Sequence, residues 1–471
     1  MAWTFVYAAP MLRAALLILL SSLSASVAGQ SEPAWPGPPA QFTSEDWIAR
    51  WPNAEAVLLQ PAELAVLRQR ALAEDPALVD LTRLPEAYPV ERLRQQIEQL
   101  LPGAATPRYR AGGALVETAD LERWRQAANL DSLIGDSIES AWALLTRRAA
   151  VRAVPSLERI HADPQQTDID RLQESALFPG DVVAVLHSSA DGRWRFVQSE
   201  NYAGWVADGV LAQTDRATAL DYRARSDRMI VAAQARLAYT PEAPALSELR
   251  LDMGVRLPEW QDWPWDRAVN GQGVMAAHVL QLPTRDGQGL LQLRPALLPR
   301  SQASRIGPLP ASRANLLRQA YRFLGERYGW GHDYGSRDCS GFVAEVYRSI
   351  GLTLPRNSGD QARMPAHRRT EFSADSGRAE RLAALAGLAP GDLAYLPGHV
   401  VMLVGFVDGE PWVIHDVHEG RIAQADGSEV RFAINGVAVT PLRPLRTSSG
   451  LDYVEAITDL QQLLPFSAER H

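Results

Sequence analysis

The stretch YGWGHDYGSRDCSGFVAEVYRSIGLTLPRNS, residues 328–358, contains the only cysteine of this 471-residue chain. After Cys339, apolar residues recur at helical spacing until Gly351, and Pro355 prevents the helix from resuming. Cys339 is therefore expected in the first turn of a helix. The helix dipole and free backbone N–H groups there can lower a thiol pKa from ~8.5 into a range of roughly 3.5–7.5. We expect Cys339 to be a nucleophilic thiolate; the alternative is a small buried apolar residue.

The N-terminal residues predict export. A short apolar core, residues 16–20, follows Arg13, and the small residues 26–28 form a cleavage site. This pattern is typical of a secretory signal over residues 1–28 and is too short for a membrane span. No cysteine follows the small residues to carry a lipid anchor, so we expect a periplasmic or secreted protein without a membrane anchor after cleavage. A single cysteine in such a compartment cannot form an internal disulfide, which favours a chemical role for it.

Two histidines are candidate partners of Cys339. His399 opens a β-branched apolar run, Asp408-Gly409 forms a turn, and His415 lies on the returning strand, which together predict a β-hairpin. A nucleophile, a base and a group that orients the base are what covalent acyl transfer requires. A tight turn at Asp408-Gly409 brings His399 nearer to His418 than to His415, however. An orienting role for His415 therefore depends on a longer loop or a β-bulge.

At this point the chain resembles the NlpC-type cell-wall cysteine peptidases, whose catalytic core is papain-like. The resemblance rests on six ordered motifs within about ninety residues. They are Tyr328-Gly-Trp330-Gly331, Asp338-Cys339-Ser340-Gly341, Leu354-Pro355-Arg356-Asn357-Ser358, Gly391-Asp392-Leu393, His399-Val400 and Ile414-His415. The resemblance implies that Cys339 is the nucleophile, His399 the general base and His415 its orienter, in preference to His418.

The same resemblance implies a set of substrate-binding residues. In relatives that trim murein peptides, the matching residues line a pocket for the substrate's N-terminal amine; here they are Tyr328, Asp338, Ser340 and Ser358. A carboxylate beside the nucleophile would pair with an ammonium and reject a blocked N-terminus. Asp338 could instead cap the helix. Tyr202 is a further candidate, because a tyrosine of the first SH3-like domain meets the substrate in those relatives.

The chain divides into several predicted parts of an α+β, multidomain fold. After the signal, residues 29–141 contain a Pro-rich linker and a mostly helical segment that resembles a stabilising N-terminal domain. Residues 142–217 have the short strands and turns of a small barrel and resemble a bacterial SH3-like domain, and residues 218–305 predict a second one. Residues 306–471 form the papain-like domain. In the second barrel Trp260, Trp263 and Trp265 could stack on sugars or pack a barrel edge.

Composition excludes several other functions. All 47 basic residues are arginine, so no lysine is available for a Schiff base or a phosphate-binding loop. The net charge of −8 and the lack of a basic stretch argue against nucleic acid. To hold a metal together, His415 and His418 would need to lie on the same face of one helix or strand, and their spacing does not place them so. We therefore expect no metal and no other cofactor.

These observations predict a peptidoglycan hydrolase, a cysteine endopeptidase that acts on murein stem peptides through a thioester. The bond implied by the resemblance is γ-D-glutamyl to a diamino acid, the partner is peptidoglycan or a muropeptide, and we expect a monomer. Two alternatives stay open. The chain could be a cell-wall-binding protein with an inert papain-like core, or an acyltransferase that passes the thioester to another acceptor.

Overall fold

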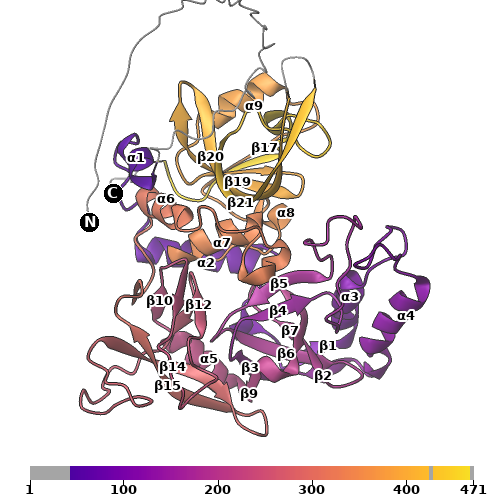
Figure 1. The fold of residues 1–471 in the computed structure, drawn as a ribbon, viewed down its shortest axis with the longest axis vertical. Helices are drawn as coiled ribbons and strands as arrows, with labels where there is room; N and C mark the ends of the chain where they lie inside the picture. Colours follow the sequence, from indigo (N-terminus) through magenta and orange to yellow (C-terminus); the bar gives the residue numbers. More distant parts are fainter. Residues whose placement is uncertain (1–42, 424–427, 467–471) are drawn as a thin grey trace, which may run out of the picture.

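The computed structural model describes residues 43–423 and 428–466, and the predicted signal of residues 1–28 lies outside them. The protein is a multidomain, mixed helix and sheet structure, as predicted. Figure 1 shows the C-terminal domain in orange and yellow lying across the helical N-terminal segment and the two β-rich parts of the chain. The parts are therefore not arranged in space in the order in which they follow one another along the sequence.

The N-terminal segment forms helices where capping residues and apolar spacing predict them. Its elements are α1 (Ser44–Ala49), α2 (Pro61–Glu74), α3 (Val90–Leu100) and α4 (Thr118–Ala127), with two 3-10 turns, η1 (Leu81–Arg83) and η2 (Leu130–Ser132), and the paired strands β1 (Ala87–Pro89) and β2 (Ser137–Glu139). Trp47 of α1 and Leu64 of α2 are buried in the core of the C-terminal domain, whereas Leu93 and Ile97 of α3 are buried against the first barrel. This segment thus fastens two domains together.

The first barrel is one continuous antiparallel sheet, in the order β5-β4-β8-β7-β6-β3-β9. Its strands are β3 (Ala141–Leu145), β4 (Ala149–Arg152), β5 (Gln173–Leu177), β6 (Val182–Ser188), β7 (Trp194–Gln198), β8 (Ala203–Ala207) and β9 (Leu211–Thr214), with a 3-10 turn η3 (Asp208–Val210). The fully buried Trp205 and Phe196 pack edge to face at 5.5 Å in its core. β5 faces the C-terminal domain and contacts the 3-10 segment η4 (Trp330–Gly335) there.

The second β-rich part is built of smaller sheets. Its elements are α5 (Arg216–Arg225), β10 (Arg228–Ile230), β11 (Gln234–Arg236), β12 (Arg250–Asp252), β13 (Arg256–Leu257), β14 (Ala277–Arg285), β15 (Leu291–Pro299) and β16 (Ser304–Ile306). It shares one hydrophobic core with the first barrel, into which Leu251 and Leu280 project. Trp260 and Trp263 pack edge to face at 6.0 Å, and Trp265 is 75% exposed.

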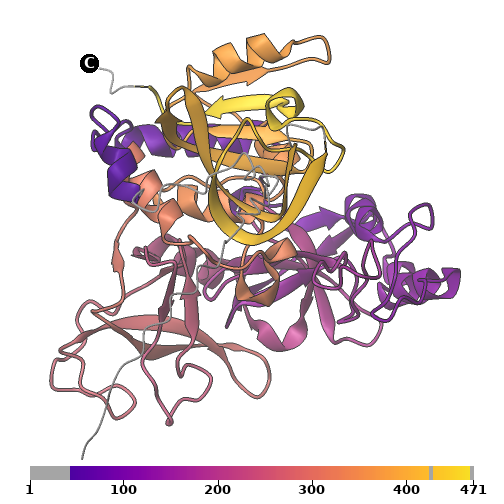
Figure 2. The ribbon, with the colours of Figure 1, turned by 45° about the horizontal axis from the view of Figure 1, so that its top comes forward.

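The C-terminal domain is a six-stranded sheet, in the order β17-β22-β18-β19-β20-β21, with a core on each face. Its elements are α6 (Arg313–Tyr321), η4 (Trp330–Gly335), α7 (Cys339–Ser349), α8 (Ser358–Gln361), β17 (Arg368–Glu371), α9 (Arg378–Leu385), β18 (Leu393–Leu396), β19 (His399–Val407), β20 (Glu410–Ala423), β21 (Glu429–Pro441), α10 (Tyr453–Ala456) and β22 (Asp459–Gln462). Figure 2 shows α9 on the side of the sheet away from the barrels. Helices α6 and α7 pack on the other face, and α7 therefore lies between the sheet and the rest of the molecule.

A local capping interaction opens this domain. Ser312 caps α6 by accepting a hydrogen bond from the Asn315 backbone N–H at 3.2 Å, and Phe323 is buried. Leu324 lies beyond α6, which ends at Tyr321, and 49% of its surface is exposed.

Candidate active site

Cys339 is the first residue of α7, as the apolar spacing predicts, and its thiol is buried. Asp338 caps the helix by accepting a hydrogen bond from the Gly341 backbone N–H at 2.9 Å. The Cys339 sulfur lies 4.0 Å from the Gly398 carbonyl oxygen, and the backbone N–H of Val400 also faces it. The sulfur therefore lies against the backbone on both sides of His399, the first residue of β19.

A β-bulge brings His399 and His415 onto one face of the sheet. Next to the Asp408-Gly409 turn, Val407 pairs with Glu410, but beyond the bulge Met402 pairs with Ile414, so the register has moved by one residue. Without that shift His415 would lie opposite Met402 and point away from His399, because neighbouring residues of a strand face opposite sides. The shift answers the register question that the sequence leaves open, and it favours His415 over His418.

The bulge is held by a residue from the far end of the chain. Gly405 follows it with a φ of 155°, and a Cβ atom there would meet the Trp47 ring at 2.8 Å. The Trp47 ring also packs against Trp412, the strand partner of Gly405, at 6.3 Å. The N-terminal helix α1 therefore supports the register on which the histidine pair depends.

The two histidines form a hydrogen-bonded chain that ends on a threonine. His399 Nε2 lies 2.9 Å from His415 Nδ1, and His415 Nε2 lies 3.0 Å from Thr440 Oγ1 on β21. His415 and Thr440 are fully buried. Because Nε2 of His399 is engaged, its Nδ1 is the nitrogen left to exchange a proton with the thiol. The sequence analysis missed Thr440, since a lone threonine on a strand carries no motif.

The thiol does not have the lowered pKa that its place in a helical first turn suggests. Burial, and after it the neighbouring Asp338 carboxylate, raise the pKa of Cys339 to about 12. The expectation of a resting thiolate is therefore wrong, chiefly because the thiol is buried and in addition because of Asp338. Its carboxylate takes up a free N–H of the first turn and adds a negative charge beside the sulfur.

The histidines are uncharged at neutral pH. Burial lowers the pKa of His399 to about 4. Burial, and then the neighbouring His399, lower the pKa of His415 well below its usual range. The resting site thus holds a neutral thiol beside a neutral imidazole that is able to accept a proton.

Asp338 has a full set of partners before any ligand binds. Arg356 donates to both carboxylate oxygens, and Gly331 N–H and the Ser340 hydroxyl donate to them as well, at 2.9 Å and 3.1 Å. The Arg356 guanidinium also donates to Ser340 Oγ at 2.8 Å and to Ser175 Oγ of the first barrel at 2.9 Å. The capping role predicted for Asp338 is confirmed, and its charge is compensated by Arg356.

The remaining predicted residues come from different parts of the chain. Tyr202 of the first barrel is half-buried and donates its hydroxyl hydrogen to Glu174. Burial raises the pKa values of Tyr202 and Tyr328, and the Arg356 charge opposes both shifts, so both tyrosines lie within reach of the same buried arginine. Ser358 opens α8 and is half-buried. Sequence reasoning missed Glu174, which lies on a strand and belongs to no motif.

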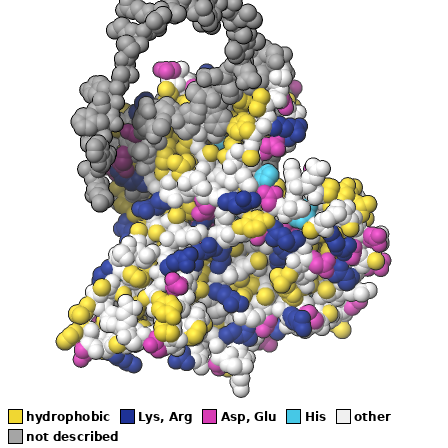
Figure 3. All heavy atoms as spheres, viewed as in Figure 1, with side chains coloured by type: hydrophobic (Ala, Val, Ile, Leu, Met, Phe, Trp, Pro, Cys, Tyr) yellow, Lys and Arg dark blue, Asp and Glu magenta, His cyan; other side chains and the backbone are white. Residues whose placement is uncertain are grey.

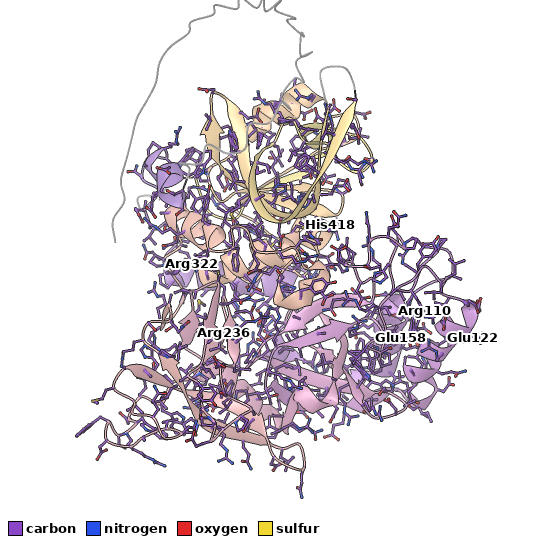
Figure 4. The ribbon with its side chains drawn as sticks, in the orientation of Figure 1. Arg110, Glu122, Glu158, Arg236, Arg322 and His418 are labelled. Carbon is purple, nitrogen blue, oxygen red and sulfur yellow. The ribbon has the colours of Figure 1, made fainter. Side chains whose placement is uncertain are left out.

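His418 lies apart from the His399–His415 pair. Its Nε2 lies 3.0 Å from an Asp168 carboxylate oxygen, and its ring packs edge to face on Tyr328 at 5.9 Å. Figure 4 places His418 where the C-terminal domain borders the first barrel, and Figure 3 shows histidine side chains reaching the surface in this region. His418 therefore contacts the predicted substrate side of the site rather than the base.

Arg148 of the first barrel fixes the loop that precedes Cys339. Its guanidinium donates to the backbone carbonyls of His332 and Ser336 at 2.9 Å and 2.6 Å, and to the Asp252 carboxylate of the second β-rich part at 2.6 Å. Both β-rich parts are thus joined to the loop before Cys339 through one arginine.

Metal binding finds no support in the described residues. Within residues 43–423 and 428–466, no three His, Cys, Asp or Glu side chains come together in a way that could hold a metal ion.

Comparison with known proteins agrees with this architecture. Residues 157–207 match the SH3 domain of the SH3b1 type, and residues 325–435 match the NlpC/P60 family. The chain is 24% identical over 260 residues to a Gamma-D-glutamyl-L-lysine dipeptidyl-peptidase of Bacillus cereus, covering 52% of this chain and 61% of that relative.

One solved structure shows the same fold over most of the chain. An NlpC/P60 endopeptidase from Photobacterium damselae subsp. piscicida superposes with a TM-score of 0.71 at 16% identity, covering 91% of this chain and 98% of the other. An NlpC/P60 family protein from Bacillus cereus has a TM-score of 0.46 at 20% identity, with 69% of this chain and 100% of the other covered. The C-terminal part of this chain is therefore an NlpC/P60 domain, carried together with an SH3 domain of the SH3b1 type.

Proposed function

We propose that the protein is a cysteine endopeptidase that cleaves peptidoglycan stem peptides at the bond between γ-D-glutamate and a diamino acid. The observation that carries the proposal is the 2.9 Å contact between His399 Nε2 and His415 Nδ1, with the Cys339 sulfur held against the backbone that flanks His399. These three side chains supply a nucleophile, a base and an orienting group. Such a set serves acyl transfer and has no use in a purely structural domain.

Acylation begins from the neutral pair of thiol and imidazole. As the Cys339 sulfur attacks the amide carbonyl carbon, its proton passes to His399 Nδ1. His415 holds the imidazole through Nε2 and stabilises the imidazolium that forms. The tetrahedral intermediate collapses, His399 gives the proton to the leaving amine, and a thioester to Cys339 remains.

Deacylation uses the same groups in reverse. His399, again neutral, removes a proton from a water molecule that attacks the thioester carbonyl carbon. The C–S bond breaks, the departing Cys339 sulfur is protonated by His399, and the acyl product leaves as a carboxylic acid. The low pKa of His399 keeps the base ready at neutral pH, since the free imidazole is unprotonated there.

The choice of substrate rests on the first barrel. An ammonium at the substrate N-terminus would meet Glu174 more favourably than Asp338, because Arg356 already compensates Asp338. Glu174 forms no ion pair with an arginine in the described part of the chain, and burial raises its pKa. A cation beside it would recover that cost. The name of the Bacillus cereus relative, a Gamma-D-glutamyl-L-lysine dipeptidyl-peptidase, supports both the scissile bond and a free N-terminus.

Export completes the proposal, because peptidoglycan lies outside the cytoplasm. It rests on the apolar stretch before residue 28, which precedes the described residues. Within the described residues, no helix has the length and apolar character needed to cross a membrane.

One experiment separates this function from its rivals. Purified protein is incubated with muropeptides, with and without an added amine acceptor, and the products are weighed by mass spectrometry. A peptidase releases the γ-glutamyl fragment as a free acid, whereas an acyltransferase gives an amide of the added amine. Unchanged muropeptides, together with measurable binding, would show a wall-binding protein instead.

A further inference from the structure

A cavity of about 180 Å³ lies behind α7, on the side away from the His399–His415 pair. Its walls come from the N-terminal segment, both β-rich parts and the C-terminal domain, with Gly341 and Ala344 of α7 forming part of one wall. The predicted catalytic residues do not line it. A water molecule needs roughly 10–15 Å³ of such volume, so the cavity holds several waters or one compact ion, and is too small for a stem peptide.

The cavity is lined by an excess of arginine. Five guanidinium groups reach it from separate elements, while the acidic residues in its wall are Asp181 and Glu200. The arginines are Arg68 of α2, Arg223 of α5, Arg256 of β13, Arg348 of α7 and Arg356 of the loop before α8. A concave site lined by one sign of charge focuses the field and draws in ions of opposite sign.

Part of this charge is not held in a close ion pair among the described residues, although the Asp181 carboxyl feels the charge of Arg348 and Asp227 acts on Arg256. Glu200 pairs with both Arg68 and Arg223, and Arg356 pairs with Asp338. Arg256 and Arg348 form no ion pair within the described residues. Arg348 rests on the Phe178 ring at 5.5 Å, and the Arg256 side chain is exposed at the cavity rim.

The arginines also act on one another. Burial, and then the charge of Arg68, lower the pKa of Arg223 to about 10. An anion among these groups would relieve the repulsion. The planar fork of a guanidinium matches the oxygen atoms of phosphate, and several forks that converge from different sides fit an oxyanion carrying more than one charge.

We propose that this cavity is a binding site for a compact, multivalent oxyanion of the phosphate class, held chiefly by Arg256 and Arg348. The site joins every part of the chain that the structure describes. Arg356 is shared between it and the catalytic side, where it holds Asp338. An anion bound here would therefore strengthen the packing of the barrels against α7. The proposal is independent of the reaction proposed above, because no catalytic group takes part.

The test measures anion binding to the full-length protein. Inorganic phosphate and pyrophosphate are titrated by calorimetry and by thermal unfolding, with sodium chloride added to keep the ionic strength constant. We expect saturable binding and a Tm that rises with anion concentration, as ligand linkage requires. Arg256→Gln removes one exposed guanidinium and should weaken the apparent Kd by about tenfold or more, since charge-assisted hydrogen bonds are lost.

The control is Arg236→Gln, which removes an exposed arginine of the same β-rich part that does not line the cavity (Figure 4). It should bind as the wild type does. Arg348→Gln is a second test, used if its unfolding without anion stays cooperative. A Tm rise that does not saturate and is equal in the wild type, Arg256→Gln and Arg236→Gln would be a general salt effect, and it would overturn the proposal.

Discussion

Arg356 donates two hydrogen bonds to the Asp338 carboxylate, at 2.6 Å to Oδ2 and 3.2 Å to Oδ1. Asp338 is thus a compensated charge and a helix cap at once, and its pKa is held far below the usual range chiefly by Arg356, against the effect of burial. A substrate ammonium has little to gain from it. The nearby Glu174, which among the described residues has a tyrosine partner but no ion pair with an arginine, becomes the carboxylate that we expect to distinguish free from blocked N-termini.

Glu174→Gln should reduce the preference for a free N-terminus. We expect wild-type kcat/KM on L-Ala-γ-D-Glu-diaminopimelate to exceed that on the N-acetylated peptide by roughly tenfold to a hundredfold, the value of one charge-assisted hydrogen bond. In the variant the two values should converge. Asp338→Asn is the comparison: it breaks a buried ion pair, so it should lower stability and slow both substrates alike. A preference that survives in Glu174→Gln and is lost only in Asp338→Asn would refute this assignment.

Cys339→Ala should abolish cleavage and leave the fold intact. The sulfur is the only nucleophile that the protein itself supplies in the mechanism, and the substitution removes one small buried atom at the start of α7. A loss of ~1 kcal/mol would move Tm by about 2–4 °C in a domain of roughly 150–250 residues. Product formation is followed by mass spectrometry and folding by circular dichroism. Turnover by the alanine variant at the wild-type rate would contradict the covalent mechanism.

His415→Ala should slow the reaction far more than His418→Ala. His415 holds Nε2 of the base, so its loss should cost roughly a hundredfold in kcat, which is within the usual contribution of general acid–base catalysis. His418 contacts Asp168 and Tyr328, and its loss should act mainly on KM. Steady-state kinetics on one substrate decides the order. The reverse order would mean that the register shift at the bulge does not select the partner of His399.

Thr440 is expected to position His415. Thr440→Val keeps the shape of the side chain but leaves His415 Nε2 without its partner, and an unsatisfied buried polar atom costs about 1–3 kcal/mol. We expect kcat to fall by about tenfold while KM stays unchanged. Thr440→Ser restores the hydroxyl and should restore kcat. If the serine variant is as slow as the valine variant, Thr440 acts through packing alone.

The activity should persist well below neutral pH. The pKa of His399 is lowered to about 4 in the folded protein, against ~6.5 for an unperturbed histidine. On the N-acetylated peptide, which has no ammonium to pair with Glu174, kcat/KM should therefore fall only as the pH drops through about 4, where the base becomes protonated. A measured profile from pH 3 to 8 tests this, and an acid limb near pH 6.5 would contradict it.

The same shift has a consequence for stability. Between about pH 6.5 and 4 the unfolded chain binds a proton at His399 that the folded protein does not bind. The stability that His399 contributes to the folded protein is thus fully present above pH 6.5, and it declines as the pH falls toward 4. His399→Ala should flatten the dependence of Tm on pH in this window.

Local features of the fold were readable from the sequence. The start of α7 at Cys339, the Asp338 cap and the Asp408-Gly409 turn depend on residues within four positions of one another. Asp408 and Gly409 adopt φ values of 51° and 77°, the left-handed region that this dipeptide favours in hairpins. Motif order and spacing were likewise sufficient to identify the papain-like domain and to single out Cys339, His399 and His415.

The protonation state of the site was not readable from the sequence. A position in the first helical turn suggests a thiolate, but the pKa of Cys339 is set by burial and by the carboxylate of its own cap. The contact of Tyr202 with Glu174 and the position of Thr440 also come from strands that are distant in sequence. No pattern along one segment records which side chains another segment will place beside it.

The histidine pair depends both on the sequence and on the tertiary structure. Sequence by itself determined that His399 and His415 lie on the two strands of one hairpin. Tertiary structure decided that they face each other, through a bulge before Gly405 that moves the strand register by one residue. Trp47, more than 350 positions earlier in the chain, occupies the space beside position 405, so only a residue without a side chain fits there. Because side chains alternate along a strand, one residue of register exchanges the two faces, and packing between distant segments fixes which face is chosen.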